Sequence, residues 1–469
     1  MKTNRYMLRA LALTLCLLSA LAAGACGETA APPLPEYPAD AFVTTAWWAP
    51  YEILEESFML YKEAGLNTVT FVNHSRAATT ATLSQTRYYL GSDLTMETLE
   101  MCRKTGLKAA IAEGGWYSPY ETDTPFSEYD LYGDYEDLII GVHITDEPSA
   151  EQMRESCSPE RIADFKSVYS VPYMINLHPV TAAGGATGTL SYAEYLQTYE
   201  ECVLQNFPDA PFVSVDFYPY HTEQYAEMDR QWVSCYEQVS ALIAKYDAEA
   251  NFYIQTAEGN EFTTGLTEDD IRYQVYMALC FGGTQLSYYC YAVPGSDYNA
   301  GEGCVTDPMY SACLLDQNNQ PTHLYGFVRE INAEIQAFAP SFKAYSFTRC
   351  MPVCVQTYGD ENFKPELYAM NTLPDFSDRR YVSDVATAGN CLVGCFDREE
   401  DEAYMLVNYG YPDETDPIEV TVTLKGGATH LAVYGGEGFT GAPEVLAGRG
   451  GRVTLTVDPG EGKFIVPLS

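Results

Sequence analysis

Residues 139–148, with the sequence IIGVHITDEP, place an apolar, β-branched segment directly before two acids and a proline. A segment with so little polar alternation is typical of a strand that is buried on both faces of a parallel sheet. Seven further segments have the same character, and longer amphipathic stretches separate them. The predicted strands are 42–48, 68–73, 107–113, 139–145, 173–178, 212–218, 252–258 and 284–291.

Helices are predicted between these strands, at 52–64, 95–105, 159–167, 193–205, 228–246 and 267–281, and then at 324–339. The clearest helix start follows Thr267, which has capping-box spacing with Asp270. Eight strand–helix units between residues 41 and 340 fit a closed (β/α)8 TIM barrel better than an open doubly wound sheet. No glycine-rich dinucleotide or phosphate loop follows a predicted strand, which weakens the open-sheet alternative.

From about residue 345 the pattern changes to short alternating strands with Gly, Asp and Pro turns. Strands are predicted at 392–396, 403–408, 418–425, 430–434, 452–457 and 463–467. Because no helical pattern separates them, they predict an all-β sandwich domain over residues 341–469. A sugar-binding role for this domain has little support, since the region contains no Trp.

The composition describes an acidic globular protein. Asp and Glu total 65 against 26 Lys and Arg, which gives a net charge of −39. A polyanion of this kind repels nucleic acid and acidic lipid headgroups, so neither is an expected partner. Apolar residues make up 46% of the chain, enough for a large core. The 38 Tyr residues suit contact with sugar rings, but they suit interfaces and sheet surfaces equally.

The N-terminus predicts export. A short basic start precedes a largely apolar run, and residues 1–25 together have the layout of a signal peptide. Residues 23–26, AGAC, resemble the lipobox of bacterial lipoproteins, although Leu is usual where Ala23 stands. The resemblance implies lipidation of Cys26 and a cell-surface lipoprotein; a secreted protein cut near Ala25 is the alternative. The proline-rich residues 26–40 predict an extended tether.

The cysteines and histidines predict no metal or other cofactor. Export permits disulfides, but their pairing cannot be read from the sequence. Cys350 and Cys354, like Cys391 and Cys395, are spaced four apart in strand-like runs without nearby His. Buried thiols or a cross-strand disulfide are therefore favoured over a metal site. A metal-dependent barrel isomerase or lyase would need clustered His and acids, and the chain has only six His.

Active sites of (β/α)8 barrels lie at the carboxyl ends of the strands. Carboxylates, aromatic rings and amides follow the predicted strands without a cationic phosphate clamp, which suits a neutral polyhydroxylated substrate. The candidate substrate-binding residues are Trp47, Trp48, Asn73, His74, Glu113, Asp146, His178, Tyr218, His221, Tyr289 and Tyr291. Asn176 and Asp216 fall at strand ends in the same rim.

The strand-four motif at 141–148 resembles that of clan A glycoside hydrolases, the retaining barrel enzymes related to families 5 and 42. In that clan an Asn-Glu pair, often followed by Pro, ends strand four, and a second Glu ends strand seven. The resemblance implies that Glu147 is the general acid/base and Glu258 the nucleophile. Asp146 departs from the usual Asn, and strand eight has tyrosines where the clan typically has Trp.

The physical requirements agree with such a pair. Retaining hydrolysis needs two carboxyl groups about 5–5.5 Å apart, one protonated and one ionised. Strands four and seven lie across a narrow barrel, so groups at their ends converge and raise each other's pKa. Asp146 would bind a sugar hydroxyl or orient Glu147. Tyr218, His221 or His178 would orient the nucleophile.

Simpler interpretations compete with these roles. Residues 146–148 have the composition of a helix start, with acids in the first turn and Pro at its first position. Glu261 and Glu113 are rivals of Glu258 as the second carboxylate. The strand-eight tyrosines divide between the barrel interior and the helix-facing layer, because side chains alternate along a strand.

The sequence therefore predicts an exported, surface-tethered glycoside hydrolase that acts on a neutral oligosaccharide or glycoside by a retaining mechanism. The alternative is a carbohydrate-binding lipoprotein on the same scaffold that lacks two suitably spaced carboxyl groups and does not catalyse hydrolysis.

Overall fold

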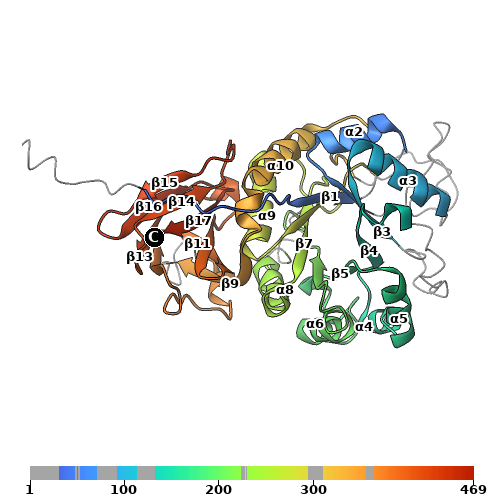
Figure 1. Cartoon of the computed structure of the whole chain (residues 1–469), viewed down its shortest axis with the longest axis horizontal. Helices are drawn as coiled ribbons and strands as arrows, with labels where there is room; N and C mark the ends of the chain where they lie inside the picture. The colour runs from blue at the N-terminus through green and yellow to red at the C-terminus, as the bar shows by residue number, and fades with distance from the viewer. Residues whose placement is uncertain are drawn as a thin grey trace, which may run out of the picture.

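The computed structural model describes residues 31–47, 50, 53–70, 92–112, 133–222, 228, 230–293, 310–354 and 363–469. A barrel of alternating strands and helices lies beside an all-β domain, drawn in orange and red (Figure 1). The predicted fold, a (β/α)8 barrel followed by a β-sandwich, is confirmed.

The barrel sheet has eight parallel strands in the order β1-β8-β7-β6-β5-β4-β3-β2. They are β1 (Val43–Trp47), β2 (Thr68–Thr70), β3 (Lys108–Ala112), β4 (Ile139–Asp146), β5 (Tyr173–Leu177), β6 (Phe212–Val215), β7 (Glu249–Gln255) and β8 (Gln285–Tyr289). Asn67 joins the two ends of this order. Its backbone N–H donates to the Thr44 carbonyl, and its Oδ1 accepts the Thr44 N–H, each at 3.0 Å.

The helices around the sheet are α2 (Glu55–Glu63), α3 (Ser92–Thr105), α4 (Ala150–Ser156), α5 (Pro159–Val168), α6 (Tyr192–Tyr199), α8 (Trp232–Tyr246), α9 (Glu268–Cys280) and α10 (His323–Phe342). A 3₁₀ turn, η3 (Val180–Ala182), precedes α6, and a π-helical turn, η4 (Glu200–Leu204), extends it. The capping box of Thr267 and Asp270 is confirmed at the start of α9. Among the described residues, no helix combines the length and apolar character that a membrane span requires.

The short helix α4 decides one of the alternatives for residues 146–148. Ser149 is its N-cap and forms a capping box with Gln152, so α4 begins after Pro148. The acids Asp146 and Glu147 are therefore outside its first turn, and the helix-start interpretation of this motif is wrong. They lie at the end of β4 instead.

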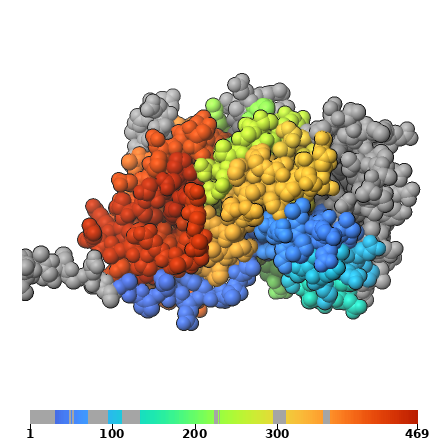
Figure 2. Space-filling view, turned by 90° about the horizontal axis from the view of Figure 1, so that it is seen from above, coloured from blue at the N-terminus to red at the C-terminus, as the bar shows by residue number. Residues whose placement is uncertain are grey.

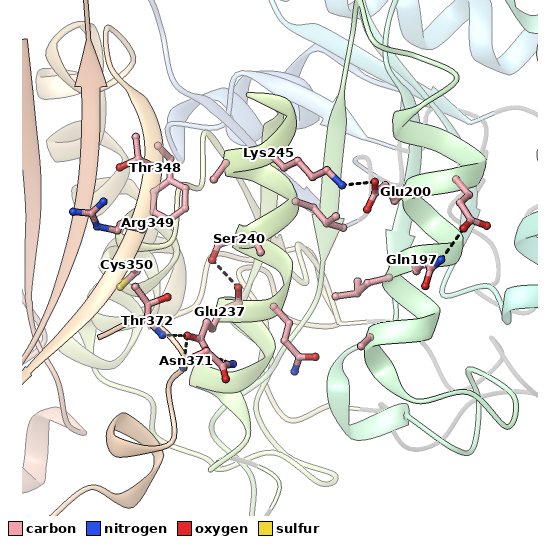
Figure 3. Close-up of a pocket in the computed structure, with 18 of the residues that line it drawn as sticks. Gln197, Glu200, Glu237, Ser240, Lys245, Thr348, Arg349, Cys350, Asn371 and Thr372 are labelled. Carbon is pink, nitrogen blue, oxygen red and sulfur yellow. Dashed lines mark hydrogen bonds and ion pairs between the residues drawn. The ribbon is translucent and has the colours of Figure 1, made fainter. Parts of the chain in front are cut away.

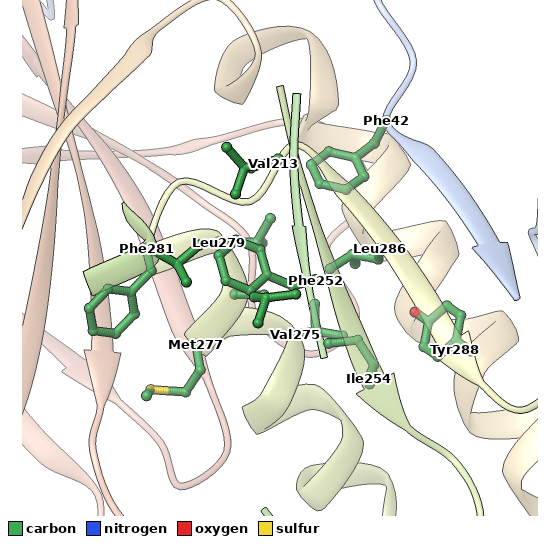
Figure 4. Close-up of a cluster of buried hydrophobic side chains, with 14 of the residues drawn as sticks. Phe42, Val213, Phe252, Ile254, Val275, Met277, Leu279, Phe281, Leu286 and Tyr288 are labelled. Carbon is green, nitrogen blue, oxygen red and sulfur yellow. The ribbon is translucent and has the colours of Figure 1, made fainter. Parts of the chain in front are cut away.

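The core between sheet and helices contains the side chains on one face of the strands (Figure 4). Phe252 and Ile254 of β7 and Leu286 of β8 are fully buried together with Val275 and Leu279 of α9. Helix α9 contacts both the barrel and the β domain, and every residue from Ile271 to Cys280 is buried. This helix is therefore central to the packing of both parts.

The β domain consists of two antiparallel sheets. One has the order β10-β13-β16 and the other β15-β14-β17-β12-β11-β9. The strands are β9 (Ser346–Cys354), β10 (Val382–Thr387), β11 (Asn390–Arg398), β12 (Asp401–Asn408), β13 (Ile418–Leu424), β14 (His430–Tyr434), β15 (Glu444–Ala447), β16 (Arg452–Val457) and β17 (Gly462–Leu468). Two short turns of helix, α11 (Pro365–Tyr368) and η7 (Pro412–Glu414), lie in its loops.

The four cysteines of this domain that are spaced four apart in the sequence are free thiols. On the adjacent strands β9 and β11, Cys350 lies opposite Gly394 and Cys354 lies opposite Asn390, so no two cysteines face each other directly. Cys350 packs in the core shared with the barrel, whereas Cys391 and Cys395 pack between the two sheets. The buried-thiol interpretation is confirmed for these three residues.

A buried charge cluster joins α9, α10 and the β domain. The Arg272 guanidinium lies 2.5 Å from Glu268 and 3.5 Å from Glu334, and both Arg272 and Glu334 are almost fully buried. The Glu334 carboxylate also accepts the Tyr276 hydroxyl and, at 3.0 Å, the Gly436 N–H from the β domain. Since buried charges are retained only with partners, this cluster holds the two parts in one arrangement.

The described end of the predicted tether lies along the β domain (Figure 2). The Tyr37 ring contacts the rings of Tyr345 and Tyr434, and the Arg398 guanidinium lies over it at 5.4 Å. The sequence predicted an extended tether over residues 26–40. Its described part instead contacts the β domain through Tyr37. Cys26 and the predicted signal peptide lie outside the described residues.

Candidate active site

Three acids meet at the carboxyl ends of β4 and β6. Asp146 is the last residue of β4, Glu147 follows it, and Asp216 directly follows β6. Between them, on β5, the Asn176 amide nitrogen donates to Asp146 Oδ1 at 3.1 Å and to Asp216 Oδ1 at 3.3 Å. The Asn176 amide group therefore connects Asp146 at the end of β4 with Asp216 at the end of β6.

Glu147 is held in an uncommon backbone conformation. Its φ of 44° lies in the left-handed region, which non-glycine residues seldom adopt. Its N–H donates to the Asn176 carbonyl at 2.9 Å, and its Oε1 lies 3.1 Å from His178 Nδ1. The Glu147 side chain remains 37% exposed, so it is oriented by His178 and still accessible. Strained backbone of this kind is often found at functional sites.

The electrostatics of the cluster favour protonated aspartates. Burial raises the pKa of Asp216 well above its usual value, and the charges of Glu147 and Asp146 raise it further. Burial likewise raises the pKa of Asp146, and Glu147 is the next cause. The hydrogen bonds from Asn176 act in the opposite direction on both but are smaller effects. Burial and the neighbouring negative charges therefore both disfavour the ionised form of the two aspartates.

A polar chain inside the barrel orients Asn176. Its Oδ1 accepts the Ser214 hydroxyl at 2.8 Å, and that hydroxyl accepts the Asn251 amide at 3.0 Å. The Asn251 Oδ1 in turn accepts the Ser287 hydroxyl at 2.8 Å. The chain runs across β5, β6, β7 and β8 and leaves the Asn176 amide hydrogens directed at the two aspartates.

An aromatic group borders the acids. Trp47, at the end of β1, packs edge-on against Tyr253 of β7, and Tyr218 lies beside Tyr289 with ring centroids 4.9 Å apart. The Tyr253 hydroxyl is buried, and after burial the charges of Asp146 and Asp216 are the main causes that raise its pKa. Tyr253 was not selected from the sequence, because only residues at strand ends were considered. Side chains alternate along a strand, so Tyr253 shares a face of β7 with Asn251, and this spacing could have identified it.

Glu258 lies in a different environment. Strand β7 ends at Gln255, three residues before it. The Glu258 carboxylate accepts the Leu266 N–H at 2.8 Å and lies 3.2 Å from His323 Nε2, at the start of α10. No contact in the described residues joins it to Glu147. The structure therefore brings Glu147 together with Asp146 and Asp216, and places Glu258 against the loops that precede α9 and α10.

The other predicted site residues are divided between several places. Asp146 and His178 belong to the acid cluster, and Trp47, Tyr218 and Tyr289 belong to the aromatic group. His221 lies beside Phe262, with ring centroids 5.5 Å apart. Tyr288 and Tyr291 pack in the helix-facing core, so Tyr291, which was predicted to bind substrate with Tyr289, lies in a different cluster from Tyr289. Trp48, Asn73, His74 and Glu113 lie outside the described residues.

The β domain supports the loop that follows Asp216. The Tyr411 hydroxyl donates to the Pro219 carbonyl at 3.1 Å, and the Tyr411 ring packs against Tyr220. Tyr220 is also fixed from the barrel side, where its backbone bonds the Gln255 side chain. The loop that carries Tyr218 is therefore held between the two parts of the molecule.

A separate cavity of about 810 Å³ lies between the barrel helices and the β domain (Figure 3). Lys245 of α8 bonds Glu200 of η4 at 2.6 Å on one side, and Glu237 accepts the N–H groups of Asn371 and Thr372 on another. None of the acid-cluster residues lines it. In the part of the chain that the structure describes, no group of His, Cys, Asp and Glu side chains is arranged to hold a metal ion.

Comparison with known proteins shows the fold. No protein-family profile and no curated protein matches the sequence. Among solved structures, a glycoside hydrolase family 42 β-galactosidase from G. stearothermophilus is similar, with a TM-score of 0.52 and 9% identity, over 92% of this chain and 99% of that one. A glycoside hydrolase family 30 xylanase from Clostridium acetobutylicum has a TM-score of 0.42 and 10% identity, over 94% and 98% of the two chains. The chain thus has the barrel-and-β-domain architecture found in the β-galactosidase.

Proposed function

We propose that this protein is a glycoside hydrolase that acts on a neutral oligosaccharide or glycoside. The observation that carries the proposal is the acid cluster, in which Asp146 and Asp216, whose pKa values are raised, adjoin the accessible Glu147. Glycoside hydrolysis needs this combination, because one group must protonate the departing oxygen while another acts at the anomeric carbon. The likeness in fold to a β-galactosidase agrees with it.

Glu147 and Asp216 are the pair that the geometry supports best. Asp216 gives its proton to the glycosidic oxygen as the bond to the anomeric carbon breaks, and Glu147, oriented by His178, attacks that carbon. The Asp216 carboxylate then accepts a proton from the water that displaces Glu147 and releases the sugar. The net configuration is retained, as in the predicted mechanism.

Two other assignments remain within the proposal. The first makes Glu147 the general acid/base, as the resemblance to clan A implies, and Asp216 the nucleophile. Glu258 as nucleophile is the second, with its carboxylate held by the Leu266 N–H and by His323 Nε2. Asp216 is favoured as the second carboxyl because it interacts with Glu147, whereas no described contact links Glu258 to Glu147.

The surroundings of the cluster support a neutral sugar as substrate. Trp47, Tyr218 and Tyr289 offer flat apolar rings of the kind that contact sugar faces. Among the described residues, the charges that raise the pKa of Asp146 and Asp216 are those of other carboxylates. A substrate with its own carboxylate would be repelled here.

A panel of aryl glycosides tests the proposal. We expect the purified protein to release the aryl alcohol from at least one neutral glycoside and to leave the matching glucuronide intact. Proton NMR of the first-formed sugar should show retained configuration. Ligand binding without turnover across the panel would instead support the carbohydrate-binding lipoprotein.

We also propose that the chain is exported and anchored through a lipid on Cys26. The basic and apolar residues 1–25 and the lipobox-like residues 23–26 support this. Mass spectrometry of the N-terminal peptide should show Cys26 as a diacylglyceryl-modified first residue. An unmodified N-terminus near Ala25 would support secretion without an anchor, and an uncleaved one would contradict export.

A further inference from the structure

Cys290 and Cys313 come together beside the aromatic group. Cys290 directly follows β8, and Cys313 belongs to the segment 310–315. Their Sγ atoms lie 3.1 Å apart, and both residues are fully buried. This separation is only about 1 Å longer than a disulfide bond.

The backbone already holds the two cysteines side by side. The Leu314 N–H donates to the Cys290 carbonyl at 3.3 Å, and the Leu315 N–H donates to the Tyr291 carbonyl at 2.7 Å. Ala292 and Leu315 form a parallel bridge immediately beyond. A bond between the sulfurs therefore needs a small side-chain adjustment and no rearrangement of either segment.

Other close cysteine pairs in the described residues are Cys157 with Cys202 and Cys280 with Cys350, and the second of these is less suited to bond formation. Cys280 and Cys350 have their Sγ atoms 3.6 Å apart, and Cys280 also directs its thiol toward the Met405 carbonyl. Burial raises the pKa of the Cys290 thiol, so once the protein has folded this thiol reacts slowly. A bond at this position would therefore form during folding, before the sulfurs are enclosed.

We propose that Cys290 and Cys313 form a disulfide in the protein when it folds outside the cytoplasm. The two thiols lose two protons and two electrons as the sulfur–sulfur bond forms. An incoming disulfide, supplied by a thiol–disulfide exchange protein or by oxidised glutathione, takes up the electrons and becomes two thiols. The bond ties the segment 310–315 to the end of β8.

This cross-link would stabilise one wall of the candidate active site. The Tyr310 hydroxyl lies 3.1 Å from that of Tyr289, and the Tyr310 ring stacks on Phe262 at 5.7 Å. Ala312 pairs with the backbone of Glu258. The disulfide would thus hold the aromatic group in place whether or not the protein hydrolyses glycosides.

Peptide mapping tests the bond without any substrate. The full chain is refolded in a glutathione redox buffer, unfolded without reductant, treated with N-ethylmaleimide and digested. We expect the peptides that contain Cys290 and Cys313 to be joined and two hydrogens lighter than their sum. Cys102 and Cys235, for which the structure gives no sulfur neighbour, should be labelled and serve as internal controls. Maleimide on both Cys290 and Cys313 would overturn the proposal.

Thermal unfolding provides a second measurement. We expect reductant to lower the wild-type Tm by about 5 °C. Cys290→Ser, Cys313→Ser and the double variant should show the same loss as one another and no further response to reductant. Cys280→Ser, which alters the more distant sulfur pair, should keep the full response. A wild-type Tm that does not depend on reductant would show that the two thiols only pack together.

Discussion

Glu147→Gln should lower kcat for glycoside hydrolysis by about 10³-fold or more, because a general acid/base alone contributes about 10²–10⁴-fold and a nucleophile more. The substitution keeps the shape of the side chain and an oxygen that can accept from His178 Nδ1. The Glu147 side chain is 37% exposed and its charge opposes the ionisation of Asp146 and Asp216, so the substitution should not lower Tm and the loss should come from chemistry. Steady-state kinetics on the best glycoside of the panel measures the effect.

The matched control for this variant is Glu151→Gln. Glu151 is an exposed acid in the first turn of α4, four residues beyond Glu147. It should retain wild-type turnover, since it makes no described contact with the acid cluster. Turnover of Glu147→Gln at the wild-type rate would remove Glu147 from the mechanism.

Chemical rescue separates the two roles open to Glu147. The Glu147→Ala variant is supplied with azide and a dinitrophenyl glycoside, whose leaving group needs no protonation. If Glu147 is the nucleophile, as its accessibility and its bond to His178 suggest, azide attacks the substrate directly and the glycosyl azide has inverted configuration. An azide product with retained configuration would assign the acid/base role to Glu147 instead.

Asp216→Asn should lower kcat by about 10²–10⁴-fold and at the same time raise stability. Asn has the same shape and its Oδ1 can still accept from Asn176. The substitution removes the proton that we assign to the leaving group. It also removes the cost of ionising a buried acid next to Glu147 and Asp146.

The gain in stability should grow with pH. The folded-state pKa of Asp216 is raised above that of the unfolded chain, so its contribution to stability is complete below the unfolded value, near 4. That contribution is lost as pH rises toward the folded-state pKa, at up to about 1.4 kcal/mol per pH unit. Denaturant unfolding from pH 5 to pH 9 should therefore show wild type losing stability relative to Asp216→Asn.

Asp209→Asn is the corresponding control. Asp209 is an exposed acid in the loop before β6 and should show neither the loss of activity nor the pH-dependent gain. A constant difference between wild type and Asp216→Asn across this pH range would mean that Asp216 ionises in the folded protein as it does in the unfolded chain. The proton assignment would then be wrong.

The position of β4 was predictable and that of β7 was not. The run 139–148 ends in Asp146 and Glu147, and the strand ends there because the apolar residues stop. Strand β7 begins at Glu249, three residues earlier than its apolar run suggested. Asn251 faces the barrel interior, where Ser214 and Ser287 bond its side chain. A polar residue buried by such a network gives no hydrophobic signal, so the predicted strand was displaced toward Glu258.

The sequence by itself determined the layers of this protein, because hydrophobic periodicity is local and an apolar run has few ways to be buried. It also placed Asp146, Glu147 and Asp216 at strand ends. Only the tertiary structure decided which acids interact, because that depends on side chains from β4, β5 and β6 meeting through space. Asn176 connects residues 146 and 216, which are distant along the chain, and the burial that raises their pKa values exists only after the barrel has closed.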